Sequence, residues 1–167
     1  AYLEDLSSPA TAHFAAGAHA ETLARFCADE AFAALAADIT AQLQDERQIP
    51  FCQEHRGRMY HFYQSAQYPK GVYRVCSAAS YRAGMPDWQV LFAVADFDEV
   101  LGDDVYLDGV SHYVEAPHQA LLTLSSAGAD AAYTVEFDLN AGAIVAGGFH
   151  FPAGKNHIAW RDENSVW

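Results

Sequence analysis

Basic residues are scarce in this sequence. Its 167 residues include nine Lys and Arg against 22 Asp and Glu, which gives a formal net charge of −13 at pH 7. A chain with this charge repels the phosphate backbone of nucleic acids and the anionic head groups of lipids. The composition therefore predicts no nucleic-acid partner and no membrane partner.

Long apolar runs are missing and cysteines are few. Every apolar stretch is interrupted by Asp, His or Gly well before the roughly 20 residues that a membrane-spanning helix needs. The first residues lack the basic and apolar pattern of a secretion signal. Three cysteines, Cys27, Cys52 and Cys76, cannot all pair, and none stands in a C-x-x-C spacing. We therefore expect a soluble, cytoplasmic chain with reduced thiols.

The spacings that hold metals and cofactors are also missing. Despite eight histidines, the sequence has no H-x-x-x-H or H-E-x-x-H pattern and no D-x-D-x-D-G calcium loop. The glycine-rich stretch 146–149 is not followed by a helical pattern that could direct N–H groups at a phosphate. We therefore expect no metal and no cofactor.

One pair of neighbours is suggestive of nucleophilic catalysis. Ser111 precedes His112, and a hydroxyl beside an imidazole base is what a serine hydrolase needs. Tyr113, however, stands where a nucleophile elbow needs a second glycine, and neighbours on a strand point to opposite faces. We interpret the pair as ordinary strand residues, so the sequence predicts no catalytic residue in this chain.

Composition changes near residue 50. Residues 10–46 are rich in Ala, and apolar side chains recur there every three or four residues, which is the period of one helix face. The pattern predicts helices over 12–26 and 30–46, with Asp29 capping the second helix and Pro50 ending it. The apolar face comprises Leu23, Phe26, Cys27, Ala31, Leu35, Ile39 and Leu43.

Beyond residue 57 the period changes to two. The turn residues 68–71 separate two aromatic runs, 58–64 and 72–75, in the pattern of a β-hairpin. A helical turn is expected at 96–101. Further strands are predicted at 88–94, 109–114, 120–124, 133–138, 143–147 and 157–160. The expected fold class is therefore α+β: a helical segment, 1–50, followed by an antiparallel β-meander, 51–167, in two blade-sized blocks, 56–115 and 118–167.

Several segments, in order, resemble the prolyl oligopeptidase family of serine peptidases, in particular its bacterial prolyl-oligopeptidase-like branch. These segments are Tyr2-Leu3-Glu4-Asp5-Leu6, His61-Phe62-Tyr63-Gln64, Pro69-Lys70-Gly71-Val72-Tyr73-Arg74, Trp88-Gln89-Val90-Leu91 with Asp96 and Asp98, Leu124-Ser125-Ser126-Ala127-Gly128-Ala129-Asp130-Ala131, Glu136-Phe137-Asp138-Leu139 and Gly148-Phe149-His150-Phe151-Pro152. Together they cover nearly the whole chain.

The resemblance implies an N-terminal fragment of such an enzyme. Residues 1–50 would pack on a C-terminal α/β-hydrolase domain, and 51–167 would form the first one to two blades of a seven-bladed β-propeller that controls access to the active site. The family's catalytic triad lies in the hydrolase domain, so this chain would be non-catalytic. The parent would hydrolyse short peptides, and cleavage after proline is one specificity that the resemblance allows.

A second hypothesis comes from the residues alone. The aromatic-rich face of strands 58–64 and 72–76 could hold a peptide or an apolar ligand in a stand-alone binding module. The two hypotheses differ in oligomeric state. A fragment leaves the apolar helix face and a strand edge uncovered, and we therefore expect it to form a homodimer.

Overall fold

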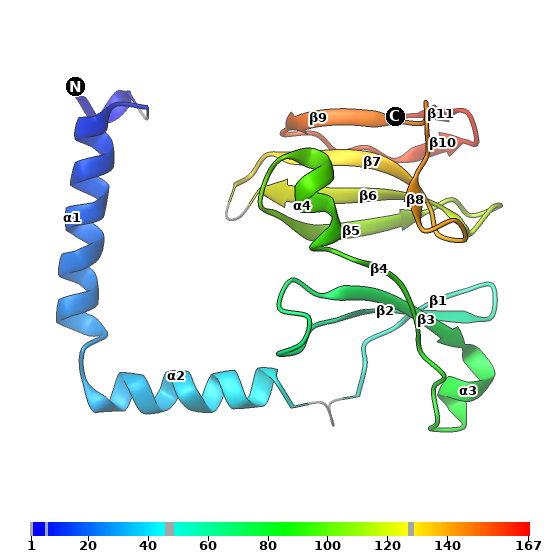
Figure 1. The fold of residues 1–167 in the computed structure, drawn as a ribbon, viewed down its shortest axis with the longest axis horizontal. Coiled ribbons are helices and arrows are strands. Elements are labelled where there is room, and N and C mark those ends of the chain that lie inside the picture. The colour runs from blue at the N-terminus through cyan, green and yellow to red at the C-terminus, as the bar shows by residue number, and fades with distance from the viewer. Residues whose placement is uncertain (1, 6, 46–48, 127–128) are drawn as a thin grey trace. The chain divides into compact units, whose positions relative to one another are not determined.

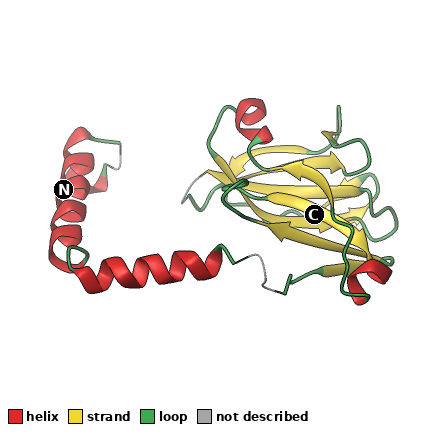
Figure 2. Cartoon of the chain, turned by 60° about the horizontal axis from the view of Figure 1, so that its bottom comes forward, coloured by secondary structure: helices red, strands yellow, loops and turns green. Residues whose placement is uncertain are grey.

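The computed structural model describes residues 2–5, 7–45, 49–126 and 129–167. The chain divides into two compact units, Ala1–Arg47 and Gln48–Trp167. The first holds two long helices, and the second holds antiparallel strands with two short helices, as Figure 2 shows by colour. The predicted order of helices followed by antiparallel strands is therefore confirmed.

Two capped helices make up most of the first unit. A short 3-10 turn, η1 (Tyr2–Glu4), precedes α1 (Pro9–Phe26) and α2 (Glu30–Leu43). Ser8 caps α1 by accepting a hydrogen bond from the Thr11 N–H at 3.1 Å, and Asp29 caps α2 by accepting one from the Phe32 N–H at 2.7 Å. The predicted role of Asp29 is confirmed.

The prediction that Pro50 ends the second helix is wrong. The helix ends at Leu43, and the Gln44 N–H closes it by donating to the Thr40 carbonyl at 3.0 Å. A proline restricts the backbone of the residue just before it, here Ile49, and does not reach back six residues.

Neither helix buries a residue. The predicted apolar face exists, but its large side chains are exposed: Leu23, Phe26, Leu35, Ile39 and Leu43. No helix in the described ranges has both the length and the apolar character to cross a membrane.

The second unit contains two antiparallel sheets and a small hairpin (Figure 1). The first sheet has the order β1 (Gln53–His55), β2 (Arg58–Tyr63), β3 (Val72–Ser77), β4 (Gln89–Ala93), with α3 (Ala78–Arg82) between its last two strands. The second has the order β5 (Val105–His112), β6 (Gln119–Ser126), β7 (Ala132–Asp138), β8 (Ala143–Ile144), with β9 (His150–Gly154) also paired to β7. Helix α4 (Asp96–Leu101) joins the sheets, and β10 (Trp160–Asp162) pairs with β11 (Ser165–Val166).

The hairpin and the α4 turn are confirmed, whereas the division into blocks is not. The second sheet begins at Val105, so the break between the sheets falls at 94–104 and not at 115–118. Gly109, expected to open a strand, instead marks a β-bulge inside β5, where the register with β6 shifts. The strand predicted at 157–160 is displaced, because β10 spans Trp160–Asp162.

The core of this unit lies where the two sheets and α4 meet. Phe92 of β4, Phe97 of α4 and Phe137 of β7 form a ring cluster with centroid separations of 5.1 to 5.6 Å, in edge-to-face orientations. Buried Val94, Val105 and other aliphatic side chains complete the cluster: Val75, Leu122, Leu124, Val135 and Leu139. This packing fixes one sheet against the other and so positions the polar groups between them.

Candidate functional site

A polar cluster lies inside the interface between the two sheets. His112 is the last residue of β5. Its Nε2 lies 2.9 Å from the Tyr73 hydroxyl oxygen, and its Nδ1 lies 3.1 Å from the Pro117 carbonyl oxygen. A carbonyl only accepts, so the Nδ1 of His112 must carry the proton. In the neutral ring, Nε2 is then the acceptor and the tyrosine is the donor.

The surroundings of His112 keep both groups neutral. Its ring lies 4.4 Å from the Tyr60 ring and 5.4 Å from the His55 ring, measured between centroids. Burial lowers the pKa of His112, and the nearby His55 adds to this effect. Burial likewise raises the pKa of Tyr73. A neutral imidazole held at both nitrogens by a hydroxyl and a carbonyl stabilises the packing of the sheets and is not placed to activate a nucleophile.

Ser111 lies on the other face of β5. Its side chain is exposed, and its carbonyl accepts a hydrogen bond from Trp160 Nε1 at 2.8 Å. The structure therefore does not bring Ser111 and His112 together as a nucleophile and base. The contact with Trp160 instead attaches the β10–β11 hairpin to the second sheet.

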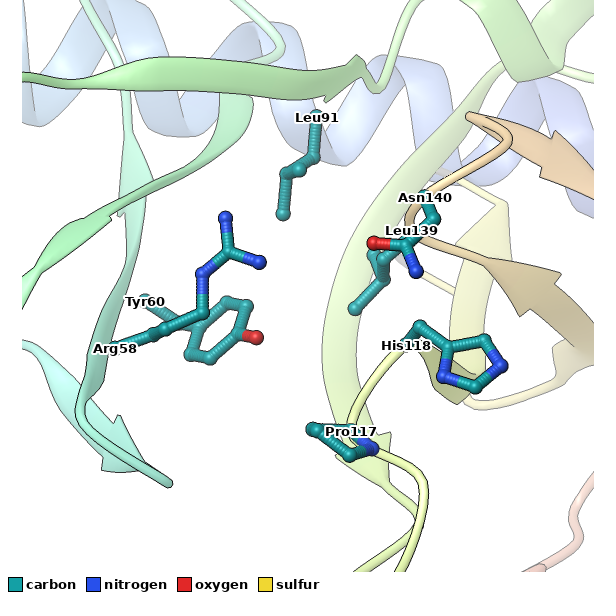
Figure 3. A pocket seen from close by; sticks show the side chains of 7 residues that line it. All are labelled: Arg58, Tyr60, Leu91, Pro117, His118, Leu139 and Asn140. Atoms are coloured by element: carbon teal, nitrogen blue, oxygen red, sulfur yellow. The ribbon is translucent and has the colours of Figure 1, made fainter.

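A cavity of about 110 Å³ opens between the sheets (Figure 3). One wall comes from the first sheet and the other from the loops that follow β5 and β7. The lining residues are Arg58, Tyr60, Leu91, Pro117, His118, Leu139 and Asn140. The Asp138 carboxylate holds the second loop by accepting the N–H groups of Asn140 at 2.8 Å and Ala141 at 3.0 Å.

A second cluster fills one face of the first sheet. The Arg74 guanidinium lies 3.9 Å from the centroid of the Tyr63 ring and 4.5 Å from that of Trp88, and its Nε donates to His61 Nδ1 at 3.1 Å. Nδ1 must therefore be unprotonated. Burial, with the Arg74 charge, lowers the pKa of His61 to about 4.

The stability of the second unit should therefore depend on the protonation of His61. The unfolded chain binds a proton at His61 below its usual pKa of 6.5, whereas the folded chain resists protonation down to about pH 4. Stability from this group is present above pH 6.5 and is lost as the pH falls toward 4. At about 1.4 kcal/mol for each pKa unit, we expect a loss of about 2–3 kcal/mol.

Urea unfolding at pH 7.0 and 4.5 measures this dependence. His61→Gln should be less sensitive to acid than the unmodified chain, while the exposed control His157→Gln should match it. Because carboxylates also titrate in this range, the test is the difference between variants. An equal loss in all three chains would contradict the assignment.

Motif residues near the first sheet form an ion-pair clamp. The Lys70 ammonium, only 16% exposed, contacts the Asp98 carboxylate at 2.5 Å and also pairs with Asp104. The other oxygen of Asp98 accepts the Val105 N–H at 3.0 Å, and the Lys70 hydrogen bond lowers the pKa of Asp98. The clamp thus connects the β2–β3 loop to α4 and to the start of β5.

Motif residues of the second sheet have a similar structural role. The buried Glu136 carboxylate accepts the Phe149 N–H at 3.0 Å. A Cβ on Gly148 would lie 2.6 Å from that carboxylate, so the close approach requires glycine. Asp130 pairs with Lys155 at 2.9 Å, but both are exposed, and such pairs contribute little. Ala127 and Gly128 of the same motif lie outside the described residues.

Histidine, cysteine and acidic side chains do not assemble a metal site within the described ranges, where no group of three could hold an ion. His55 faces His112, whereas His61 contacts Arg74. The three cysteines are free: Cys76 is buried, and Cys27 and Cys52 are partly buried.

Comparison with known proteins gives a consistent picture. No protein-family profile matches the chain. Over its full length the chain is 27% identical to an uncharacterized peptidase of Sinorhizobium fredii, of which it covers 23%. A 112-residue stretch, 67% of the chain, is 28% identical to an uncharacterized peptidase of Rickettsia prowazekii and covers 16% of it.

The structural comparison extends over 99% of the chain. It matches 25% of a post-proline cleaving enzyme from Rickettsia typhi with a TM-score of 0.85 and 22% sequence identity. The chain has the fold of part of that enzyme. The resemblance indicated by the motifs is therefore confirmed by relatives named as peptidases and by this fold. The chain spans about a quarter or less of the length of these proteins.

Sequence reasoning missed the cluster around His112 and the cavity beside it. Tyr73 and His112 are 39 positions apart, so no local spacing relates them. One indirect signal was present in the sequence. Ser111 and His112 are neighbours on a strand, so if the Ser111 side chain faces solvent, the His112 side chain faces the interior. The cavity likewise depends on loops from two sheets.

Proposed function

We propose that this chain is the non-catalytic, N-terminal part of a serine-type oligopeptidase that hydrolyses short peptides after proline. The observation that carries the proposal is the fold match over 99% of the chain to a quarter of a post-proline cleaving enzyme. Two relatives named as peptidases support it. The proposal places the catalytic residues elsewhere in the parent.

In this proposal the two sheets are the first blades of a seven-bladed β-propeller. Propeller blades are antiparallel meanders that pack face to face, and the shared core of Phe92, Phe97 and Phe137 fits that arrangement. The β10–β11 hairpin, attached through Trp160, would begin the next blade. The propeller would restrict access of long polypeptides to the active site.

The helices have a separate role in the proposal. Seven large apolar side chains of α1 and α2, including Leu35 and Leu43, are exposed, which is unusual for a surface that remains in water. We assign this face to the C-terminal α/β-hydrolase domain of the parent. When that domain is missing, the same face is the expected contact of a homodimer.

The gating role is tested with the complete polypeptide that contains this chain. We expect rapid cleavage of a short peptide with one proline and little cleavage of the same site inside a long, unfolded polypeptide. An unfolded polypeptide is the right comparison, because only its length then protects the site. A peptide with Ala in place of Pro tests the specificity. Equal rates for the short and long substrates would contradict gating.

A ligand-binding module is the second candidate, and one observation favours it. A cavity of about 200 Å³ borders the aromatic strands β2 and β3 and is lined by Tyr60, Phe62 and Tyr73 together with residues 107–110. Cleavage of the short proline peptide by the complete polypeptide, in the experiment above, would favour the peptidase hypothesis over the ligand-binding module.

A further inference from the structure

We propose that the cavity shown in Figure 3 binds a carboxylate on a short apolar stem and thereby links the two sheets. Arg58 supplies the charge. Its guanidinium points into the cavity, and within the described part of the chain no hydrogen-bond or ion-pair partner of this side chain is found. Arg58 is exposed as a residue, so an anion from solution can reach its guanidinium.

Further polar groups face the same space. The Tyr60 hydroxyl points into the cavity, although the residue as a whole is 3% exposed, and burial raises its pKa, so the hydroxyl keeps its proton. The side-chain amide of Asn140 lies across the cavity from the Arg58 guanidinium. The ring of His118 points away from both Arg58 and Tyr60 and is not assigned to the ligand.

Nearby carboxylates are engaged elsewhere. Asp138 accepts the backbone N–H groups of the loop that carries Asn140. Asp87 borders a neighbouring cavity that Arg58 also lines, and it accepts a hydrogen bond from the Ser80 hydroxyl. The structure thus leaves the guanidinium open to an anion from outside.

The size and walls of the cavity limit the ligand. About 110 Å³ has room for only a few non-hydrogen atoms, since an apolar cavity of about 150 Å³ holds one benzene molecule. Leu91, Pro117 and Leu139 line it with apolar surface, which favours a carboxylate bearing a methyl or ethyl group over phosphate. A guanidinium and a hydroxyl match the two oxygens of a carboxylate.

Binding would connect groups from both sheets. Arg58 and Tyr60 belong to β2, whereas Asn140 follows β7. A ligand that contacts both sides stabilises the folded state by mass action. The inference does not depend on the proposed peptidase function, because every residue that lines the cavity belongs to the second unit.

Isothermal titration calorimetry and thermal unfolding of the chain test the inference with propionate as the probe. We expect propionate to bind and to raise the unfolding temperature, whereas propionamide, which has the same shape without charge, should do neither. Sodium chloride at equal ionic strength and inorganic phosphate serve as controls. Equal effects of propionate and propionamide, or of propionate and chloride, would overturn the proposal.

Variants locate the site. Because a charge-assisted hydrogen bond contributes about 1.5–3 kcal/mol, Arg58→Gln should weaken propionate binding about tenfold or more. Tyr60→Phe should weaken it less. Arg82→Gln, which changes another exposed arginine outside the cavity, should bind like the unmodified chain. Unchanged binding by Arg58→Gln would place the carboxylate elsewhere and refute the assignment.

The same assay distinguishes two sources of the carboxylate. A dipeptide with a free C-terminus and its C-terminal amide are compared with propionate. Tighter binding of the free dipeptide than of propionate would identify a peptide C-terminus as the ligand. Binding of propionate alone would identify a free small acid, and binding of neither would overturn the proposal.

Discussion

Phe137→Ala should destabilise the second unit by about 3–5 kcal/mol, the usual cost of removing a buried aromatic ring. Phe137 is 2% exposed and contacts Phe92 and Phe97 at centroid distances of 5.1 and 5.6 Å. Removing its ring leaves a cavity where β4, α4 and β7 meet. Since a domain of this size has a stability of about 5–15 kcal/mol, much of it would be lost.

Urea unfolding followed by near-ultraviolet circular dichroism measures this change. Phe51→Ala is the matched control, because Phe51 is 96% exposed and its ring contributes little to the core. The control should unfold like the unmodified chain. A loss below about 1 kcal/mol in Phe137→Ala would mean that the two sheets do not share this core.

Gly71→Ala is expected to cost about 2–4 kcal/mol from two independent causes. The backbone of Gly71 has φ of +89°, which an L-residue adopts only with strain. An added Cβ would also lie 2.3 Å from Cζ of the Phe62 ring, so that ring must move. The position is fixed, because the Gly71 N–H donates to the Tyr68 carbonyl and its own carbonyl accepts the Val94 N–H.

Two further variants separate the causes. Gly84→Ala places a Cβ at φ of +72° with no atom within 4 Å, so it measures the backbone strain alone, about 1 kcal/mol. In the double variant Phe62→Ala with Gly71→Ala, the steric part should vanish and the strain should remain. If Gly71→Ala costs no more than Gly84→Ala, the close approach of Phe62 is not a constraint.

The sequence predicted the elements that have a strong local signal. The spacing of Leu35, Ile39 and Leu43 repeats every four residues, and Asp29 stands at the start of the run, so the second helix could be placed from local information. Side chains in β2 and β3 alternate between the two faces of the sheet, and turn residues separate the two strands, so the hairpin could also be placed from local information. Motifs then supplied the resemblance to a peptidase family.

Elements were missed where local rules are violated. The edge strand β9 contains Pro152, which cannot donate to a ladder and therefore argues against a strand unless the strand lies at an edge. Gly109 indicated a strand boundary but lies inside β5, directly after the register shift at Asp108. The strand β1 has only three residues, too few for a periodic pattern.

The candidate sites were missed for a different reason. Arg58 and Asn140 are more than 80 positions apart and line the same cavity only because the sheets pack on one another. Lys70 and Asp98 were found as motif residues, but their ion pair became visible only in three dimensions. Such contacts depend on tertiary packing, which local periodicity does not encode.

Labelling with a serine-directed fluorophosphonate, followed by mass spectrometry of the labelled peptide, tests most directly whether this chain is the non-catalytic part of a serine peptidase. We predict that residues 1–167 alone take up no label, and that the complete polypeptide is labelled at one serine outside this range. Stoichiometric labelling of Ser111, lost in His112→Gln, would contradict the account.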